Sequence, residues 1–531
     1  MLKTLTNQSS RAPEILIAAV TITVHLLIAV THGGPVALPD VSAYLSYGQY
    51  LHGGYLIDPT PYFPGYGLAH ALFGNLPGPQ LHTVALVGNA LAAGLIVWLA
   101  ASFSRRHGAS PAVVIFCSFL AAIHPAVSSS SRIGWPETWL ILLLLLICEL
   151  LSHRSIRSMC AAGLATGIAV SLHPRAVVLV VGILVAAVSI RQLRSVLYGL
   201  VPAVTLVIAA LTLTSSWPTS RIAAANSNIA DSNMFATSSG QLLALSAGTC
   251  GFALLGLIHS STSSIKAFAR KRAQSDVSAS PELTFLSVSA VSMIILGGIV
   301  LSGSIREDTL LYGRYIDPWS LPLAFIGVIA ISTKKLKSSS SLTAAPIILL
   351  TLLVSLASAG KVSETYRIIM VQSLSALWRL DLPLVLTIIG CSVLSAIAVI
   401  AARSSSKIVI LVTLLMVCSL SVTSTIINQT HLRRVGEISD GQSFTAAQLP
   451  EKETCLSHDR SVDKSYPVWL YRLKLPKIEH RRIDLRSGET PCGRYVIADS
   501  SVANICRNMQ LVESEPRAEW SLWTYPAEGC N

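Results

Sequence analysis

The residues best suited to chemistry lie in polar segments between long apolar runs. The first such segment, 32–79, contains two acids, Asp40 and Asp58. From Val41 onward the apolar residues recur at helical spacing and small polar residues fill the other faces, which predicts an amphipathic helix on the membrane surface. Asp40 directly precedes this helix. There it can cap the helix N-terminus or, in a partly desolvated cleft, take a proton from an alcohol.

Two further polar segments contain charged residues at the mouths of apolar runs. Glu137 follows Trp135 and Pro136, so it can stabilise the first turn of a helix or serve as a second acid. His173 and Arg175 lie in the sequence HPR between two short apolar runs. They can bind a phosphate, or they can be an interfacial histidine and an arginine that reaches the membrane surface.

The segment 304–318, SIREDTLLYGRYIDP, is the richest in charge. Arg314 has tyrosines on both sides, including Tyr315, and a guanidinium beside aromatic rings is well suited to hold an anion. The alternative is a solvated turn with interfacial tyrosines. The sequence therefore predicts an anion-binding arginine here or a simple surface turn.

The elements that position these residues are membrane helices. The chain of 531 residues is 52% hydrophobic and only 12% charged, against about 25% charged in soluble domains. Apolar runs near the length that a bilayer requires predict about 13 spans. We place them at 14–31, 80–103, 111–127, 136–151, 159–173, 176–190, 196–213, 241–259, 283–303, 318–332, 343–359, 382–402 and 407–427.

The loops between these spans alternate in charge, and the basic loops are expected in the cytoplasm. The basic positions are Lys3, Arg11, Arg105, Arg106, Arg154, Arg157, Arg191, Arg194, Lys266–Arg272, Lys334, Lys335, Lys337, Arg403 and Lys407. This pattern predicts a multi-pass plasma-membrane protein with a cytoplasmic N-terminus. We expect Ile15–Val30 to be an uncleaved signal-anchor span, and 32–79 and everything after about 428 to face outward.

Several classes of function are disfavoured. The net charge of +12 comes mainly from short clusters between apolar runs, which disfavours a nucleic-acid surface. No glycine-rich phosphate loop precedes a helix, and no Cys/His spacing is typical of a zinc site. The sequence indicates no cofactor with certainty, and a divalent metal is possible but not indicated.

The segment 431–531 is polar and charged and predicts a small extracytoplasmic α/β or β-rich domain, whereas 1–430 forms the membrane domain. Four of the ten cysteines lie in this segment: Cys455, Cys492, Cys506 and Cys530. In an oxidising compartment they predict one or two disulfides with three possible pairings, and four free buried thiols are the alternative.

Together these features resemble the GT-C superfamily of polyprenyl-phosphate-sugar-dependent glycosyltransferases. The resemblance rests on the first outer loop with an acid near its start, on YFPGYGL before the second span, and on YGRYIDP late in the membrane part. The Cys-bearing outer tail is similar to that of actinobacterial cell-envelope arabinofuranosyl- and mannosyltransferases. Many members have two adjacent acids in the first loop, whereas Asp40 stands alone here, so a second acid would come from Asp58 or Glu137.

The resemblance implies an all-α, GT-C-like membrane domain that moves a hexosyl or pentosyl unit, with inversion, from a polyprenyl-phosphate donor. The acceptor is a cell-envelope glycan, lipid or protein at the outer face. It further implies that Asp40 is the general base and that Arg314, His173 and Arg175 bind the donor phosphate, all in one outer crevice. The expected substrate-lining aromatics are Tyr44, Tyr62, Tyr66, Trp135 and Tyr315.

Two other classes of function remain open. A polytopic lipid or glycan transporter would place ionisable residues in the middle of its spans, whereas the acids here gather in outer loops. A non-catalytic envelope scaffold would use the tail to bind partners, and the tail contains Trp469, Trp520 and Trp523.

Overall fold

The computed structural model describes residues 11–32, 34–36, 39–56, 62–214, 219–229, 231, 233–272, 280–303, 307–334, 338–360, 371–404, 406–442, 444–462, 466–516 and 518–526. The chain divides into two compact units. The first consists of Met1–Leu26, Asn89–Ser131 and Pro136–Gln429, and the second of Leu27–Gly88, Arg132–Trp135 and Thr430–Asn531.

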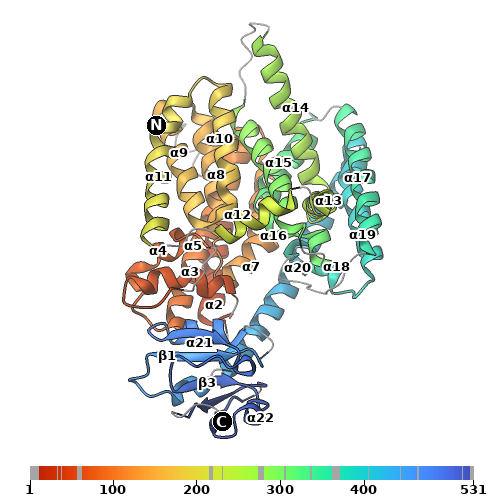
Figure 1. Ribbon diagram of the computed structural model, residues 1–531. Coiled ribbons are helices and arrows are strands. Elements are labelled where there is room, and N and C mark those ends of the chain that lie inside the picture. The colour runs from red at the N-terminus through yellow and green to blue at the C-terminus, as the bar shows by residue number, and fades with distance from the viewer. Residues whose placement is uncertain are drawn as a thin grey trace. The chain divides into compact units, whose positions relative to one another are not determined.

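The first unit is a bundle of apolar helices. Within it α9 packs against α8, α10 and α11, and these helices run side by side in Figure 1. The helices that lie wholly or mostly in this unit are α2 (Ala12–Val30), α5 (Gly78–Arg106), α6 (Pro111–Ile123), α7 (Pro125–Ile133), α8 (Glu137–His153), α9 (Ile156–Leu172), α10 (Val177–Ser189), α11 (Leu193–Leu213), α12 (Thr219–Asn228), α13 (Asn233–Ala247), α14 (Phe252–Arg272), α15 (Pro281–Leu301), α16 (Gly313–Ser332), α17 (Ser338–Ala359), α18 (Ser375–Trp378), α19 (Leu384–Arg403) and α20 (Lys407–Gly441). Short 3₁₀ helices are η2 (Pro174–Ala176), η3 (Glu307–Leu311) and η4 (Gln372–Leu374).

Among the described residues, nine helical segments are long and apolar enough to cross a membrane, or up to ten if a bent pair counts as one span. The polytopic all-α prediction is therefore confirmed, and each predicted span lies on one helix except 111–127, which covers α6 and part of α7, and 241–259. Three of those helices, α8, α9 and α10, contain only 17, 17 and 13 residues. At 1.5 Å per residue they are shorter than the hydrocarbon thickness of about 30 Å.

The predicted span 241–259 is two helices rather than one. Helices α13 and α14 meet at 109° across the residues 248–251. Gly251 has a φ of 92°, and a side chain there would meet the Ser395 carbonyl oxygen at 2.3 Å. The Cys250 carbonyl leaves the helical pattern and accepts from the Ala398 amide at 3.0 Å. Because hydropathy averages over a window, it does not detect this break.

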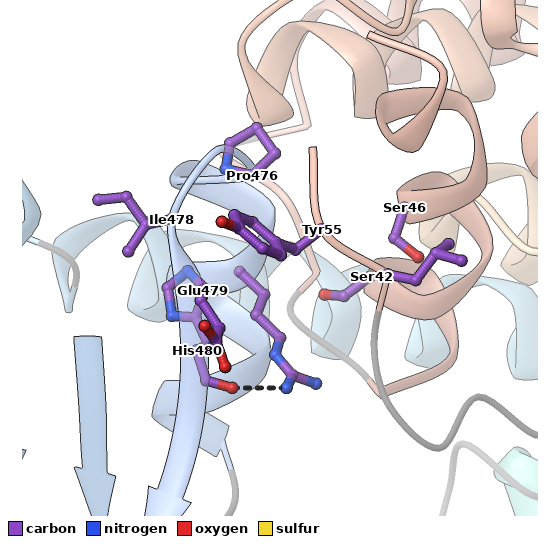
Figure 2. Close-up of a pocket in the computed structure, with 9 residues that line it drawn as sticks. Ser42, Ser46, Tyr55, Pro476, Ile478, Glu479 and His480 are labelled. Atoms are coloured by element: carbon purple, nitrogen blue, oxygen red, sulfur yellow. Dashed lines mark hydrogen bonds between the residues drawn. The ribbon is translucent and has the colours of Figure 1, made fainter. Parts of the chain in front are cut away.

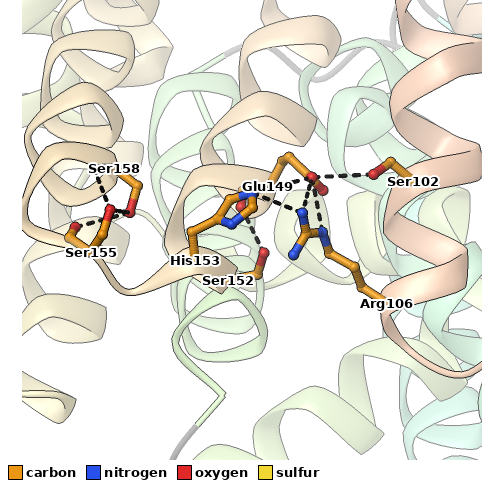
Figure 3. A network of polar contacts seen from close by, with 7 residues as sticks. All are labelled: Ser102, Arg106, Glu149, Ser152, His153, Ser155 and Ser158. Carbon is orange, nitrogen blue, oxygen red and sulfur yellow. Dashed lines mark hydrogen bonds and ion pairs between the residues drawn. The ribbon is translucent and has the colours of Figure 1, made fainter. Parts of the chain in front are cut away.

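A polar network joins α5 to α8 near the ends that the charge pattern predicts to be cytoplasmic (Figure 3). Glu149 Oε1 lies 2.6 Å from Arg106 Nη2 and accepts from Ser102 Oγ at 3.2 Å. Arg106 Nη2 also donates to His153 Nε2 at 2.8 Å. The Glu149 carboxylate of α8 thus satisfies two side chains of α5, which fixes the ends of the two helices together.

The first loop contributes α3 (Pro39–Tyr50), α4 (Gly65–Ala69) and η1 (Ala71–Phe73) to the second unit. The predicted helix after Asp40 is present, but the prediction of an exposed polar face was wrong. Every residue from Val41 to Gln49 is buried. One reason is the close packing of α3 on α4, since a side chain at Gly67 would lie 1.9 Å from the Tyr44 carbonyl oxygen.

The C-terminal part of the second unit is an α/β domain. Its five-stranded sheet has the order β2-β1-β3-β5-β4, in which β1 pairs in parallel with β2 and β3, whereas β5 pairs antiparallel with β3 and β4. Figure 1 shows β1, β3 and α21 in this domain. The elements are η5 (Phe444–Gln448), β1 (Cys455–Asp459), α21 (Tyr466–Lys474), β2 (Glu479–Ile483), η6 (Leu485–Ser487), β3 (Tyr495–Ala498), α22 (Val502–Ile505), β4 (Gln510–Ser514) and β5 (Ser521–Thr524).

Alternation along the strands builds an apolar core on each face of the sheet. Val496 packs with Ile483 and Trp523, whereas its neighbour Ile497 packs with Leu456 and Leu522. Strand β1 is buried along its whole length because it has neighbours on both sides.

A disulfide joins Cys455 at the start of β1 to Cys492 in the segment before β3. This confirms one of the predicted bridges. Cys506 is buried in the core of the domain and Cys530 lies outside the described residues, so a second bridge stays a prediction.

Candidate functional site

Asp40 lies in the first turn of α3, within the second unit. Because the helix already begins at Pro39, Asp40 is inside the helix rather than at the residue that precedes it. The Tyr62 hydroxyl donates a hydrogen bond to Asp40 Oδ1, and Asp40 is only partly buried. The carboxylate is therefore held in one orientation and keeps access to solvent.

Aromatic side chains from the first loop pack behind this acid. The Tyr44 ring lies 4.9 Å from the Tyr62 ring and 5.7 Å from the Tyr66 ring, centroid to centroid. Tyr47 donates to the Tyr62 carbonyl at 2.7 Å, which fixes the residue that contacts Asp40. Tyr44, Tyr62 and Tyr66 were predicted from the sequence as substrate-lining residues, whereas Tyr47 was not. Tyr44 and Tyr66 are fully buried, so they support Tyr62 rather than offer a free surface.

His70 extends this aromatic cluster. Its ring lies 4.8 Å from the Tyr66 ring, and its Nδ1 forms a 2.8 Å hydrogen bond with the Tyr66 carbonyl. Burial lowers the pKa of His70, and the contact with the carbonyl opposes this shift. The imidazole is therefore neutral near pH 7.

The predicted phosphate-binding arginines meet in the first unit. Glu137 Oε1 lies 2.9 Å from Arg175 Nη2 and 2.8 Å from Arg314 Nε. Arg175 Nη1 also donates to the Arg314 carbonyl at 3.0 Å, and its guanidinium lies 5.4 Å from the centre of the Tyr315 ring. His173 Nδ1 accepts from the Arg175 amide at 3.1 Å, so it shapes the turn that carries Arg175.

All three charged groups of this arginine–glutamate cluster are almost completely buried. The exposed fractions are 3% for Glu137, 4% for Arg175 and 6% for Arg314. Two guanidiniums share one carboxylate oxygen, and among the described residues Glu137 Oε2 has no hydrogen-bond partner. The cluster is thus an arginine pair with an internal carboxylate as its counter-ion.

A fourth charged member comes from the charge-rich segment 304–318 but was not predicted as a site residue. Asp317 is 2% exposed, its Oδ1 accepts from Ser373 Oγ at 2.8 Å, and its charge interacts with Arg175 and Glu137. Asp317 follows Arg314 by three residues on α16, which is the spacing of neighbours on one helix face. That spacing was a usable signal, whereas nothing in the sequence indicates Ser373. Two carboxylates and two guanidiniums make the group neutral overall.

The remaining predicted site residues are placed as follows. Trp135 is fully buried in the second unit, and Tyr315 is partly buried beside Arg175 in the first. Asp58 lies outside the described residues. Since Asp40 and Arg314 belong to different units, their expected meeting in one crevice stays a prediction. Within the described part of the chain, no group of three or more His, Cys, Asp or Glu side chains could hold a metal ion.

The fold is similar to that of a known membrane protein. The structure of ArnT from Cupriavidus metallidurans bound to undecaprenyl phosphate matches with a TM-score of 0.53, at 14% identity, over 97% of this chain and 98% of that chain. ArnT from the same organism in the apo state matches with a TM-score of 0.50, with the same identity and coverage. The oligosaccharyltransferase from Archaeoglobus fulgidus, tethered to an acceptor peptide, reaches 0.42 at 12% identity over 91% of this chain and 69% of that one.

No protein-family model matches the sequence, and no curated protein matches it. The likeness to the ArnT structures, at 14% identity, establishes the fold alone. The chain has a GT-C-like fold with many membrane-spanning helices and a small C-terminal sheet domain, as the sequence predicted.

Proposed function

We propose that this protein is a membrane glycosyltransferase that uses a polyprenyl-phosphate sugar as its donor. The observation that carries the proposal is the match to ArnT along almost the full length of both chains, in a structure that contains undecaprenyl phosphate. The acceptor is a cell-envelope glycan, lipid or protein at the outer face of the plasma membrane. The N-terminus is cytoplasmic and the C-terminal domain is extracytoplasmic, in keeping with the positions of the basic loops.

In this proposal Asp40 is the general base. It takes the proton from the acceptor hydroxyl while the hydroxyl oxygen attacks the anomeric carbon. The bond from that carbon to the phosphate oxygen breaks, and the polyprenyl phosphate leaves with the electron pair. A single displacement of this kind inverts the anomeric centre. The hydrogen bond from Tyr62 and the partial exposure of Asp40 support the assignment, because a base must be oriented and still reachable.

Arg175 and Arg314 bind the departing phosphate. Paired guanidiniums match the geometry of phosphate oxygens. Their positions are already fixed by Glu137, so the site is ordered before the donor arrives. The donor phosphate competes with Glu137 for these donors. His173 acts through the turn that carries Arg175.

The first experiment measures sugar transfer by the purified full-length protein in lipid nanodiscs. The donors are synthetic short-chain polyprenyl-phosphoryl arabinofuranose and mannose, each with a hydroxyl acceptor. We expect release of polyprenyl phosphate together with a glycosylated acceptor. Accumulation of the donor inside sealed vesicles without transfer would support a transporter instead. If neither transfer nor uptake is observed, the result would support the scaffold function.

A second experiment tests the phosphate assignment. Arg314→Ala is expected to raise the KM for the donor more than the KM for the acceptor, because it removes a phosphate contact. Arg433→Ala is the control, since that side chain is 64% exposed and pairs with Glu437 at 2.8 Å. Equal effects of Arg314→Ala on both KM values, together with a lower melting temperature, would indicate a purely structural role.

A further inference from the structure

A cavity of about 320 Å³ lies in the second unit, where α3 faces α21 and the start of β2 (Figure 2). Ser42 and Ser46 line it from α3, Tyr55 from the chain that follows, and Arg472 and Glu479 from the C-terminal domain. The rest of the wall is mainly apolar. The volume is at the lower end of the range of roughly 300–1,000 Å³ that is typical of small-ligand sites.

This pocket is separate from the Asp40 cluster although both use α3. Ser42 and Ser46 are four residues apart and share one face of the helix. Asp40 precedes Ser42 by two residues, about 200° around the helix axis, and it faces Tyr62. The same helix thus presents the proposed base on one side and two hydroxyls to the pocket on another.

The polar groups of the pocket are held in place by the protein. Ser42 Oγ donates to the Trp469 carbonyl at 2.8 Å, and Ser46 Oγ donates to the Ala43 carbonyl at 2.8 Å. Since each hydroxyl proton is used, the oxygens face a ligand as acceptors. Arg472 Nη2 donates to the His480 carbonyl at 2.8 Å, and the guanidinium lies 5.6 Å from the centre of the Trp469 ring.

The ligand chemistry follows from charge and shape. Arg472 and Glu479 have opposite charges, so the wall has no net charge and offers both donors and acceptors to a ligand. Tyr55 offers a ring that is 48% exposed, and its backbone amide is fixed by a 2.9 Å bond to the Pro476 carbonyl. An exposed aromatic face beside hydroxyl, carboxylate and guanidinium groups suits a ring with one apolar face and many hydroxyls. That description is met by a neutral sugar.

We propose that this pocket is a second carbohydrate subsite, which binds a neutral sugar residue of the acceptor glycan away from the hydroxyl that is glycosylated. The identity of the glycan as an acceptor rests on the proposed function, whereas sugar binding by the pocket does not require transfer. Tyr55 stacks on the sugar ring, and Arg472 and Glu479 bind its hydroxyls.

The test is sugar binding by the full-length protein in nanodiscs. The probes are a linear arabinofuranosyl tetrasaccharide and a linear mannopyranosyl tetrasaccharide, observed by saturation-transfer NMR and titration. We expect one of them to bind the wild type, and Tyr55→Ala and Glu479→Gln each to raise its Kd by about tenfold. Tyr50→Ala is the matched control, because Tyr50 is 43% exposed but lies outside the pocket, and it should leave the Kd unchanged.

Three results would overturn the proposal: equal Kd values for Tyr55→Ala and Tyr50→Ala, displacement of the sugar by millimolar inorganic phosphate, or no binding of either tetrasaccharide. Asp40→Asn separates this proposal from the proposed function. That variant should bind the sugar as the wild type does even though it transfers none. Binding to a wild-type protein that transfers nothing would uphold the pocket and reject the transferase.

Discussion

The two units of the chain accommodate buried ionisable side chains in different ways. In the first unit Glu137 forms an ion pair with Arg175 at 2.9 Å and accepts a hydrogen bond from Arg314 at 2.8 Å, with all three side chains buried. In the second unit Asp40 is partly exposed and is held by the uncharged hydroxyl of Tyr62. The second unit also buries a pair of histidines, with His458 Nε2 3.0 Å from His480 Nδ1.

The difference follows from the surroundings. Inside an apolar helix bundle no water solvates a charged side chain, and an unpaired charge there is costly. A buried carboxylate in the first unit is therefore paired with cations. In the α/β domain burial keeps the histidines neutral, which lowers the pKa of His480 to about 3 and the pKa of His458 well below its usual value. Near the surface, Asp40 stays accessible to a substrate. In the proposed mechanism, these surroundings favour Asp40 over Glu137 as the base.

The largest expected effect comes from Asp40→Asn. The amide cannot accept the proton, so the rate of sugar transfer should fall by about 10²–10⁴-fold while the fold is retained. Single-turnover transfer measures the rate. Asp440→Asn is the control in the same unit, because its side chain is 61% exposed and pairs with Lys474 at 3.2 Å. A near-normal rate of transfer by Asp40→Asn would show that Asp40 has a structural role and is not the base.

Glu137→Gln should destabilise the arginine–glutamate cluster of the first unit. Two guanidiniums would lose their shared counter-ion, and removal of one member of a buried ion pair costs about 3–5 kcal/mol of unfolding free energy. Chemical denaturation in detergent measures this change. Glu437→Gln removes a surface pair whose glutamate is 51% exposed and should cost less than about 1 kcal/mol. Similar losses for both variants would contradict the contrast between the units.

The neutral histidine pair predicts an acid-sensitive α/β domain. The unfolded chain takes up protons below about pH 6.5, whereas folded His480 does so only near pH 3. The contribution of the neutral histidines to the free energy of unfolding is therefore fully present above pH 6.5. It falls as the pH drops below that value, by about 1.4 kcal/mol per pH unit for each neutral histidine. Hydrogen exchange of the β1 and β2 amides in the intact protein, between pH 7 and pH 5, measures the slope.

His480→Gln should remove the uptake of one proton on unfolding, which reduces that slope by about 1.4 kcal/mol per pH unit. His153→Gln, at a side chain that is 49% exposed, should leave it unchanged. A domain whose protection does not depend on pH over this range would show that the histidines are not buried as a neutral pair.

The smallest effect is expected for Tyr62→Phe. It removes the hydrogen bond from an uncharged hydroxyl to the Asp40 carboxylate, worth about 1.5 kcal/mol, and should slow transfer by roughly tenfold. Tyr50→Phe, at a tyrosine with no part in the site, is the control for the transfer assay. A loss as large as that of Asp40→Asn would mean that Tyr62 itself takes part in proton transfer.

Much of the fold could be read from local sequence properties. Apolar runs of bilayer length predicted the helices, and the change to a polar tail predicted the sheet domain. The Cys455–Cys492 bridge was among the predicted pairings. The sequence analysis also grouped Arg175 with Arg314 as phosphate ligands, and the structure places them in contact although they are 139 residues apart.

Other features required the three-dimensional arrangement. The burial of α3 depends on the close approach of α4, and the bend between α13 and α14 depends on contacts of Cys250 and Gly251 with α19. The pocket depends on a hydrogen bond between Ser42 and Trp469, which are 427 residues apart. Periodicity and hydropathy describe a segment by itself, so they do not indicate which segments meet.

The amino-acid sequence alone predicted a polytopic helical membrane protein, a polar tail with cysteines that can form one or two disulfides, and a short set of charged candidates. A bilayer imposes length and composition on each span separately, and those constraints are visible one segment at a time. Only the tertiary structure decided that Glu137 pairs with both arginines and that Tyr62 holds Asp40. The charge state and access of a side chain depend on neighbours that packing brings together from distant parts of the chain.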